Sequence, residues 1–158
     1  MIASSGDALS AAGFVEAIKR DLLPLVDCLT PNLAEAAALL GEPVARSEEE
    51  MARQGAALLK LGPRAVLMKG GHLDGCEAAD LLVRPDRTLR FAAAKIDSRN
   101  LHGTGCVLSS AIAAHIACGA SLPDAFAAAK IFVSEAIERG RCVTLGAGPG
   151  PLIQAKLR

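Results

Sequence analysis

The chain has 158 residues, 51% hydrophobic and 22% charged, a composition typical of one folded domain. Its 17 Lys and Arg residues balance 17 Asp and Glu residues, so its charge predicts neither nucleic acid nor an anionic membrane as a partner. No apolar run reaches the roughly 18 residues of a membrane span. The first residues lack the pattern of a secretory signal, and the five cysteines form no CxxC pair, so we expect a cytoplasmic protein without a disulfide or zinc framework.

Helical segments and short apolar strands alternate along the chain. The sequence predicts helices over 11–21, 33–40, 47–61, 104–118 and 122–138, strands over 25–29 and 65–68, and a hairpin of 80–83 with 88–92. We expect Ser47 and Glu50 to form a capping box. No strand is predicted before the first helix. This alternation predicts an α/β fold with a mainly parallel sheet flanked by helices, in one domain over 1–158.

The segment His102-Gly103-Thr104-Gly105-Cys106 stands directly before an apolar helix. Glycines at a helix start leave backbone N–H groups unshielded, and these groups together with the positive helix end can bind an anion. The Thr104 hydroxyl could add a further donor, and Cys106 could accept a proton from a substrate hydroxyl. Alternatively, the two glycines serve only a tight turn from strand to helix.

Two further candidate segments follow the predicted strands. Lys69 precedes two glycines at the carboxyl end of a strand, where ligands bind in open α/β sheets, and it could neutralise phosphate charge. A solvated lysine before a glycine turn is the alternative. Asn32 is predicted to cap a helix with Glu35 as its partner, which by itself accounts for both residues. In a functional interpretation, Glu35 holds magnesium indirectly, through metal-bound water.

Taken in order, the segments LLPLVDCLTPNLAEAAALLG, AVLMKGGHL, HGTGCVLSSAIAA and LGAGPGPL resemble the hydroxymethylpyrimidine/phosphomethylpyrimidine kinases of thiamine biosynthesis. The resemblance covers essentially the whole chain. Cys106 follows Gly-Thr-Gly at a position where sugar kinases of the same superfamily carry Asp. In this feature the chain resembles the hydroxymethylpyrimidine/phosphomethylpyrimidine kinases and the related pyridoxal kinases. The resemblance implies a ribokinase-like fold and ATP- and Mg²⁺-dependent phosphorylation of 4-amino-5-hydroxymethyl-2-methylpyrimidine and then of its monophosphate.

The resemblance also implies a role for each candidate residue. It implies an anion hole at Gly103, Thr104 and Gly105, a catalytic base at Cys106, a contact of Lys69 with the ATP phosphates, and magnesium with its waters organised by Asn32 and Glu35.

Members of this family are longer, and Met1 resembles an internal methionine of theirs. We therefore expect the N-terminal strands to be missing, together with most residues that hold the pyrimidine, and the kinase activity to be impaired. A catalytically inactive nucleotide-binding fragment and a pyridoxal kinase-like enzyme are the alternatives. Missing strands would expose an apolar sheet edge, so we expect the chain alone to be weakly soluble, to form a homodimer through that edge, or to need a partner.

Overall fold

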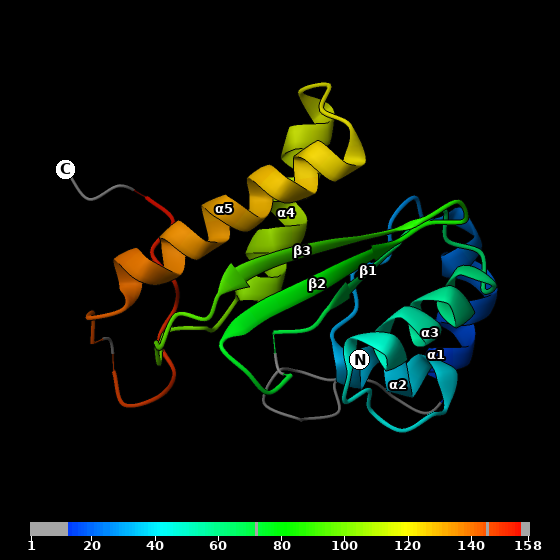
Figure 1. Ribbon diagram of the computed structural model, residues 1–158, viewed down its shortest axis with the longest axis horizontal. Helices are drawn as coiled ribbons and strands as arrows, with labels where there is room; N and C mark the ends of the chain where they lie inside the picture. Colours follow the sequence, from blue (N-terminus) through cyan, green and yellow to red (C-terminus); the bar gives the residue numbers. More distant parts are fainter. Residues whose placement is uncertain (1–12, 72, 145, 156–158) are drawn as a thin grey trace. The chain divides into compact units, whose positions relative to one another are not determined.

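The computed structural model describes residues 13–71, 73–144 and 146–155 (Figure 1). The chain forms two compact units, Met1–Ala92 and Ala93–Arg158. The expectation of a single domain over 1–158 stays a prediction. Residues 11 and 12 of the first predicted helix lie outside the described residues.

The first unit holds most of the short elements. It contains α1 (Phe14–Ala17), a π-helical segment (Ile18–Leu22), a 3-10 turn (Leu23–Leu25), α2 (Leu33–Leu40), α3 (Glu48–Leu59), β1 (Val66–Lys69), β2 (Glu77–Val83) and most of β3 (Thr88–Ala94). The strand predicted over 25–29 is wrong as a continuous strand, since Leu25 ends the 3-10 turn. Pro24 within this turn has a fixed φ and no N–H to donate to a sheet, which favours the turn.

The sheet has the strand order β1-β2-β3, and β1 pairs antiparallel with β2. β2 and β3 confirm the predicted hairpin, closed by a bond from the Arg84 N–H to the Arg87 carbonyl (2.9 Å). Within the described part of the first unit, parallel pairing is confined to bridges from Leu29 to Val66 and from Asn32 to Lys69. Short loops without a crossover helix join the three strands, and such loops return the chain in the antiparallel sense.

The core of the first unit lies between one face of this sheet and helices α2 and α3. Val66 and Met68 of β1 lie on that face with Leu81 and Val83 of β2, and all four are buried. Alternation along the strands places Lys69 and Asp80, which are opposite each other in the register, on the other face. The sheet therefore separates this helix-facing core from the side chains of Lys69 and Asp80.

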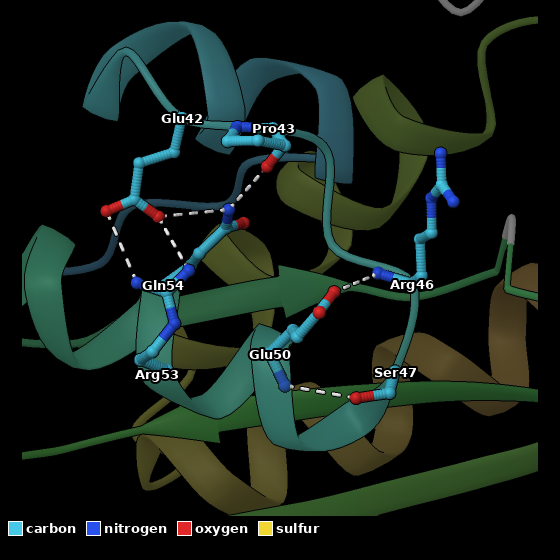
Figure 2. Close-up of polar contacts among 7 residues, drawn as sticks. All are labelled: Glu42, Pro43, Arg46, Ser47, Glu50, Arg53 and Gln54. Atoms are coloured by element: carbon cyan, nitrogen blue, oxygen red, sulfur yellow. Dashed lines mark hydrogen bonds and ion pairs between the residues drawn. The ribbon is translucent and has the colours of Figure 1, made fainter.

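The N-terminus of α3 is fastened to the loop that precedes it (Figure 2). The Ser47 Oγ accepts a hydrogen bond from the Glu50 N–H (3.3 Å), while the Glu50 carboxylate accepts from the Arg46 N–H (2.6 Å). The Glu50 carboxylate thus caps Arg46 rather than Ser47, so the predicted capping box forms only in part. Farther along α3, Arg53 forms an ion pair with Glu42 (2.7 Å).

The second unit is built on two helices, α4 (Thr104–Ala117) and α5 (Leu122–Gly140), which pack against each other. Gly119 lies between them in a left-handed backbone conformation (φ 91°). None of the helices in the described part of the chain is long and apolar enough to cross a membrane.

The segment that leads into α4 is held by the C-terminal tail. Asn100 is buried and donates from its amide to the Gly140 carbonyl and to the Val143 carbonyl (2.6 Å). Two residues later, the His102 N–H donates to the Gly150 carbonyl (3.2 Å). These bonds within the second unit fix the loop that precedes the glycine-rich start of α4.

Candidate functional site

The first group of candidate residues surrounds the end of β1. Lys69 is the last residue of this strand, and its N–H donates to the Pro31 carbonyl (3.0 Å). A parallel bridge joins Asn32 to Lys69. The first unit therefore brings the Asn32–Glu35 segment beside Lys69 at the carboxyl ends of two parallel segments, the edge at which open α/β sheets bind ligands.

Asn32 and Glu35 form the predicted capping box at the start of α2. The Asn32 Oδ1 accepts from the Glu35 N–H (2.7 Å), and the Glu35 Oε2 accepts from the Asn32 N–H (2.9 Å). Both side chains are partly exposed. Glu35 Oε1 has no hydrogen-bond partner among the described residues. The box thus explains why both residues stand here, yet it leaves one carboxylate oxygen available.

Few side chains near this strand end could bind a metal ion directly. The described residues contain no group of three or more His, Cys, Asp or Glu side chains that could hold a metal ion. Mg²⁺ in kinases is held by one or two carboxylates, substrate phosphates and water. The available oxygen of Glu35 fits an indirect role, as the acceptor of a hydrogen bond from a metal-bound water.

The turn after Lys69 is tightly fixed. The Gly70 N–H donates to the Oδ1 of the buried Asp80 (3.0 Å), and the Gly70 carbonyl accepts from the Leu73 N–H (2.9 Å). A Cβ on Gly70 would overlap the Ala79 carbonyl oxygen and lie 2.7 Å from the Met51 Cε. Asp80 is not among the site residues predicted from the sequence, although a lone carboxylate in the apolar run Ala-Asp-Leu-Leu-Val is a signal that could have revealed it.

The second group of candidate residues forms the N-terminus of α4. Gly103 caps this helix in a left-handed conformation (φ 84°), and its carbonyl accepts from the Val107 N–H (2.9 Å). The Thr104 hydroxyl donates to the Leu101 carbonyl (2.6 Å), so in this structure its hydrogen is used within the loop. The further donor expected from Thr104 is therefore already engaged.

Two backbone donors remain at this helix start. The N–H groups of Gly105 and Cys106 bond to no acceptor among residues 13–71, 73–144 and 146–155. Cys106 is exposed in the first turn of α4. Unpaired N–H groups at the positive end of a helix attract negative charge. The turn can therefore hold an anion next to a thiol that is accessible to a substrate.

The structure thus groups the predicted site residues into two sets. Asn32, Glu35 and Lys69 come together in the first unit. Gly103, Thr104, Gly105 and Cys106 come together in the second.

Comparisons with known proteins agree with the family resemblance. The family model described as phosphomethylpyrimidine kinase matches residues 1–152. The hydroxymethylpyrimidine/phosphomethylpyrimidine kinase of Rhizobium meliloti is 49% identical over 152 residues, which are 96% of this chain and 57% of that protein. The chain thus spans just over half the length of this relative.

Solved structures share the fold. The phosphomethylpyrimidine kinase from Clostridium difficile 630 is 38% identical with a TM-score of 0.73, covering 87% of this chain and 54% of that one. Pyridoxal kinase from Staphylococcus aureus, in complex with AMP-PCP and pyridoxal, is 30% identical with a TM-score of 0.87, covering 94% and 55%. These likenesses confirm the expected α/β, ribokinase-like fold class.

Proposed function

Because the chain belongs to the phosphomethylpyrimidine kinase family, we propose that it phosphorylates 4-amino-5-hydroxymethyl-2-methylpyrimidine and then the monophosphate, with ATP as co-substrate. The observation that supports this proposal most directly is the arrangement of groups at the start of α4. There the N–H groups of Gly105 and Cys106 have no acceptor among the described residues, and the Cys106 thiol is exposed. Phosphoryl transfer depends on such preorganised donors.

Each residue has a defined role in the proposed reaction. Cys106 takes the proton of the hydroxymethyl group, whose oxygen forms a bond to the γ-phosphorus while the bond to the ADP oxygen breaks. The unbonded N–H groups of Gly105 and Cys106 stabilise the negative charge on the transferred group. Lys69 neutralises charge on the ATP phosphates. Bound Mg²⁺ would supply further neutralisation of phosphate charge, and Glu35 Oε1 would orient one of its waters.

The support for ATP comes from the solved neighbours. The Staphylococcus aureus pyridoxal kinase holds AMP-PCP, and the Bacillus subtilis pyridoxal kinase holds ADP. A cytoplasmic location and a homodimer stay predictions. Cell fractionation tests the first, and sedimentation equilibrium of the purified chain tests the second.

Pyridoxal phosphorylation is a second candidate activity. The likeness to a pyridoxal kinase structure has a TM-score of 0.87, against 0.73 for the Clostridium difficile phosphomethylpyrimidine kinase. Sequence identity favours the pyrimidine, because it reaches 49% with the Rhizobium meliloti enzyme and 30% with the pyridoxal kinase. Parallel assays with the two acceptor alcohols separate these candidates.

The experiment is a mass-resolved transfer assay with the purified chain, ATP, Mg²⁺ and either acceptor. We expect phosphorylated pyrimidine from the unaltered chain. Cys106→Ala should lower its formation by roughly 10²–10⁴-fold, the usual contribution of a positioned base. Cys118→Ala is the matched control, because this cysteine is also exposed but lies at the opposite end of α4.

Three outcomes would contradict the proposal. Unchanged transfer in Cys106→Ala would remove the thiol from the reaction. Faster phosphorylation of pyridoxal than of the pyrimidine would favour the second candidate. Nucleotide binding without transfer to either acceptor would leave the chain as a nucleotide-binding protein without kinase activity.

A further inference from the structure

Asp80 is a charged residue in a buried, apolar stretch of β2. It is 6% exposed, and its neighbours Ala79, Leu81, Leu82 and Val83 are all buried. Burying a carboxylate costs free energy unless hydrogen bonds or an opposite charge compensate for it. An apolar residue would suit the strand better if packing alone mattered. The presence of Asp80 therefore calls for a cause outside the packing of the sheet.

Two contacts of Asp80 lie at the end of β1. Its Oδ1 accepts a hydrogen bond from the Gly70 N–H (3.0 Å), and its Cα is paired in the register with that of Lys69. Directly opposed residues of antiparallel strands have their Cβ atoms on the same face, roughly 5 Å apart. Asp80 thus fixes the residue that follows Lys69 and shares a sheet face with the Lys69 side chain.

Two other contacts complete the restraint on this strand end. The Lys69 N–H is held by the Pro31 carbonyl (3.0 Å). Gly70 is packed against the Ala79 carbonyl and Met51 so closely that no Cβ fits. The backbone is thus anchored on both sides of the Lys69 Cα, and the direction of the Cα–Cβ bond is set by these anchors. The hydrogen bond from the Gly70 N–H to the Asp80 carboxylate is the polar anchor that a side chain supplies.

We propose that Asp80 is a positioning residue: the hydrogen bond from Gly70 to its carboxylate holds the end of β1 in the conformation that presents Lys69 to the phosphates of a nucleoside triphosphate. The inference rests on the proposed function in one respect, the use of Lys69 as a phosphate-binding group. Asp80 affects nucleotide affinity by positioning Lys69. Once Lys69 is removed, a substitution of Asp80 should therefore no longer change the affinity.

The test measures binding of MgATP by titration calorimetry in Asp80→Ala, Asp80→Asn, Lys69→Ala and the double variant Asp80→Ala/Lys69→Ala. We expect Asp80→Ala to raise the Kd about tenfold, as the loss of a charge-assisted hydrogen bond would. Asp80→Asn keeps an oxygen acceptor for the Gly70 N–H and should raise the Kd less than about threefold. In the Lys69→Ala background, Asp80→Ala should change the Kd less than about twofold.

Two controls separate positioning from stability. Leu82→Ala removes a fully buried side chain from the same face of the same strand, so it should lower the Tm without changing the Kd. Amide exchange at Gly70, followed by NMR, reports the hydrogen bond without any nucleotide. Its protection should fall in Asp80→Ala and remain in Asp80→Asn.

The outcomes distinguish this inference from the proposed function. Additive effects of Asp80→Ala and Lys69→Ala on the Kd, or an unchanged Kd in Asp80→Ala, would overturn the inference even if the pyrimidine is phosphorylated. Non-additive effects in a chain that binds MgATP but transfers no phosphate would support the inference while the proposed function fails. A chain that binds no MgATP would overturn both.

Discussion

The close packing around Gly70 leads to a sharp prediction about stability. A Cβ placed on Gly70 would overlap the Ala79 carbonyl oxygen and lie 2.7 Å from the Met51 Cε. The Ala79 oxygen belongs to the backbone of β2, so it cannot rotate away as a side chain could. The next residue, Gly71, has open space around its Cβ position and no positive φ. Gly70→Ala and Gly71→Ala therefore form a matched pair.

The two substitutions should change the free energy of unfolding differently. Overpacking a core typically costs about 1–3 kcal/mol, and moving the Gly70 backbone would also weaken its hydrogen bond to Asp80. We expect Gly70→Ala to lower the free energy of unfolding by about 3 kcal/mol. For a chain of this length that corresponds to a fall in Tm of roughly 6–12 °C. Gly71→Ala should be neutral or stabilise by up to about 1 kcal/mol, because alanine restricts the unfolded chain.

Urea denaturation followed by circular dichroism measures both variants against the unaltered chain. A shift of the urea midpoint with an unchanged m-value would show that stability itself has changed. Equal stabilities of the Gly70→Ala and Gly71→Ala proteins would refute the reasoning, because they would mean that β1 and β2 separate at this point without cost.

Two further predictions concern titratable groups. Burial raises the pKa of the Cys28 thiol to about 11. Alkylation of Cys28 at pH 8 should therefore be much slower than alkylation of the exposed Cys106. Quantitative mass spectrometry of labelled peptides measures both rates. Hydrogen bonds from Arg53 lower the pKa of Glu42. The pair therefore stabilises the fold at pH values above the ordinary pKa of glutamate, and this stabilisation disappears as the pH falls through the lowered pKa. Glu42→Gln should therefore lose less stability than the unaltered chain between pH 6 and pH 3 in urea titrations; an equal loss would contradict this.

Most helices could be predicted from local sequence signals. The structure confirms α2 at the predicted bounds, because Asn32, Glu35 and Gly41 supply a capping box and a left-handed end within the helix's own neighbourhood. The apolar run at 65–68 and the turn at 84–87 likewise predicted β1 and the hairpin. Such features depend on residues close together in the chain, which a sequence displays directly.

Errors arose where a distant contact or a competing local geometry decided the outcome. The run from Leu25 to Leu29 has the apolar character of a strand, yet Leu25 belongs to the 3-10 turn Leu23–Leu25, and among the described residues this run joins the sheet through one isolated bridge, from Leu29 to Val66. Ser47 and Glu50 have the spacing of a capping box, but the Glu50 carboxylate finds the Arg46 N–H instead. The N–H groups of Arg46 and Ser47 are neighbours along the chain, so spacing alone could not show which of them the carboxylate would meet.

By itself, the sequence determined the family, the α/β class and the candidate residues Asn32, Glu35, Lys69, Gly103, Thr104, Gly105 and Cys106, because their types and order are visible along the chain. Only the tertiary structure decided how each is held. It placed Asn32 beside Lys69, engaged the Thr104 hydroxyl with Leu101, and set Asp80 against Gly70. The physical reason is that strand register and close packing join residues far apart in the chain, and no local pattern encodes which backbone group a buried carboxylate will meet.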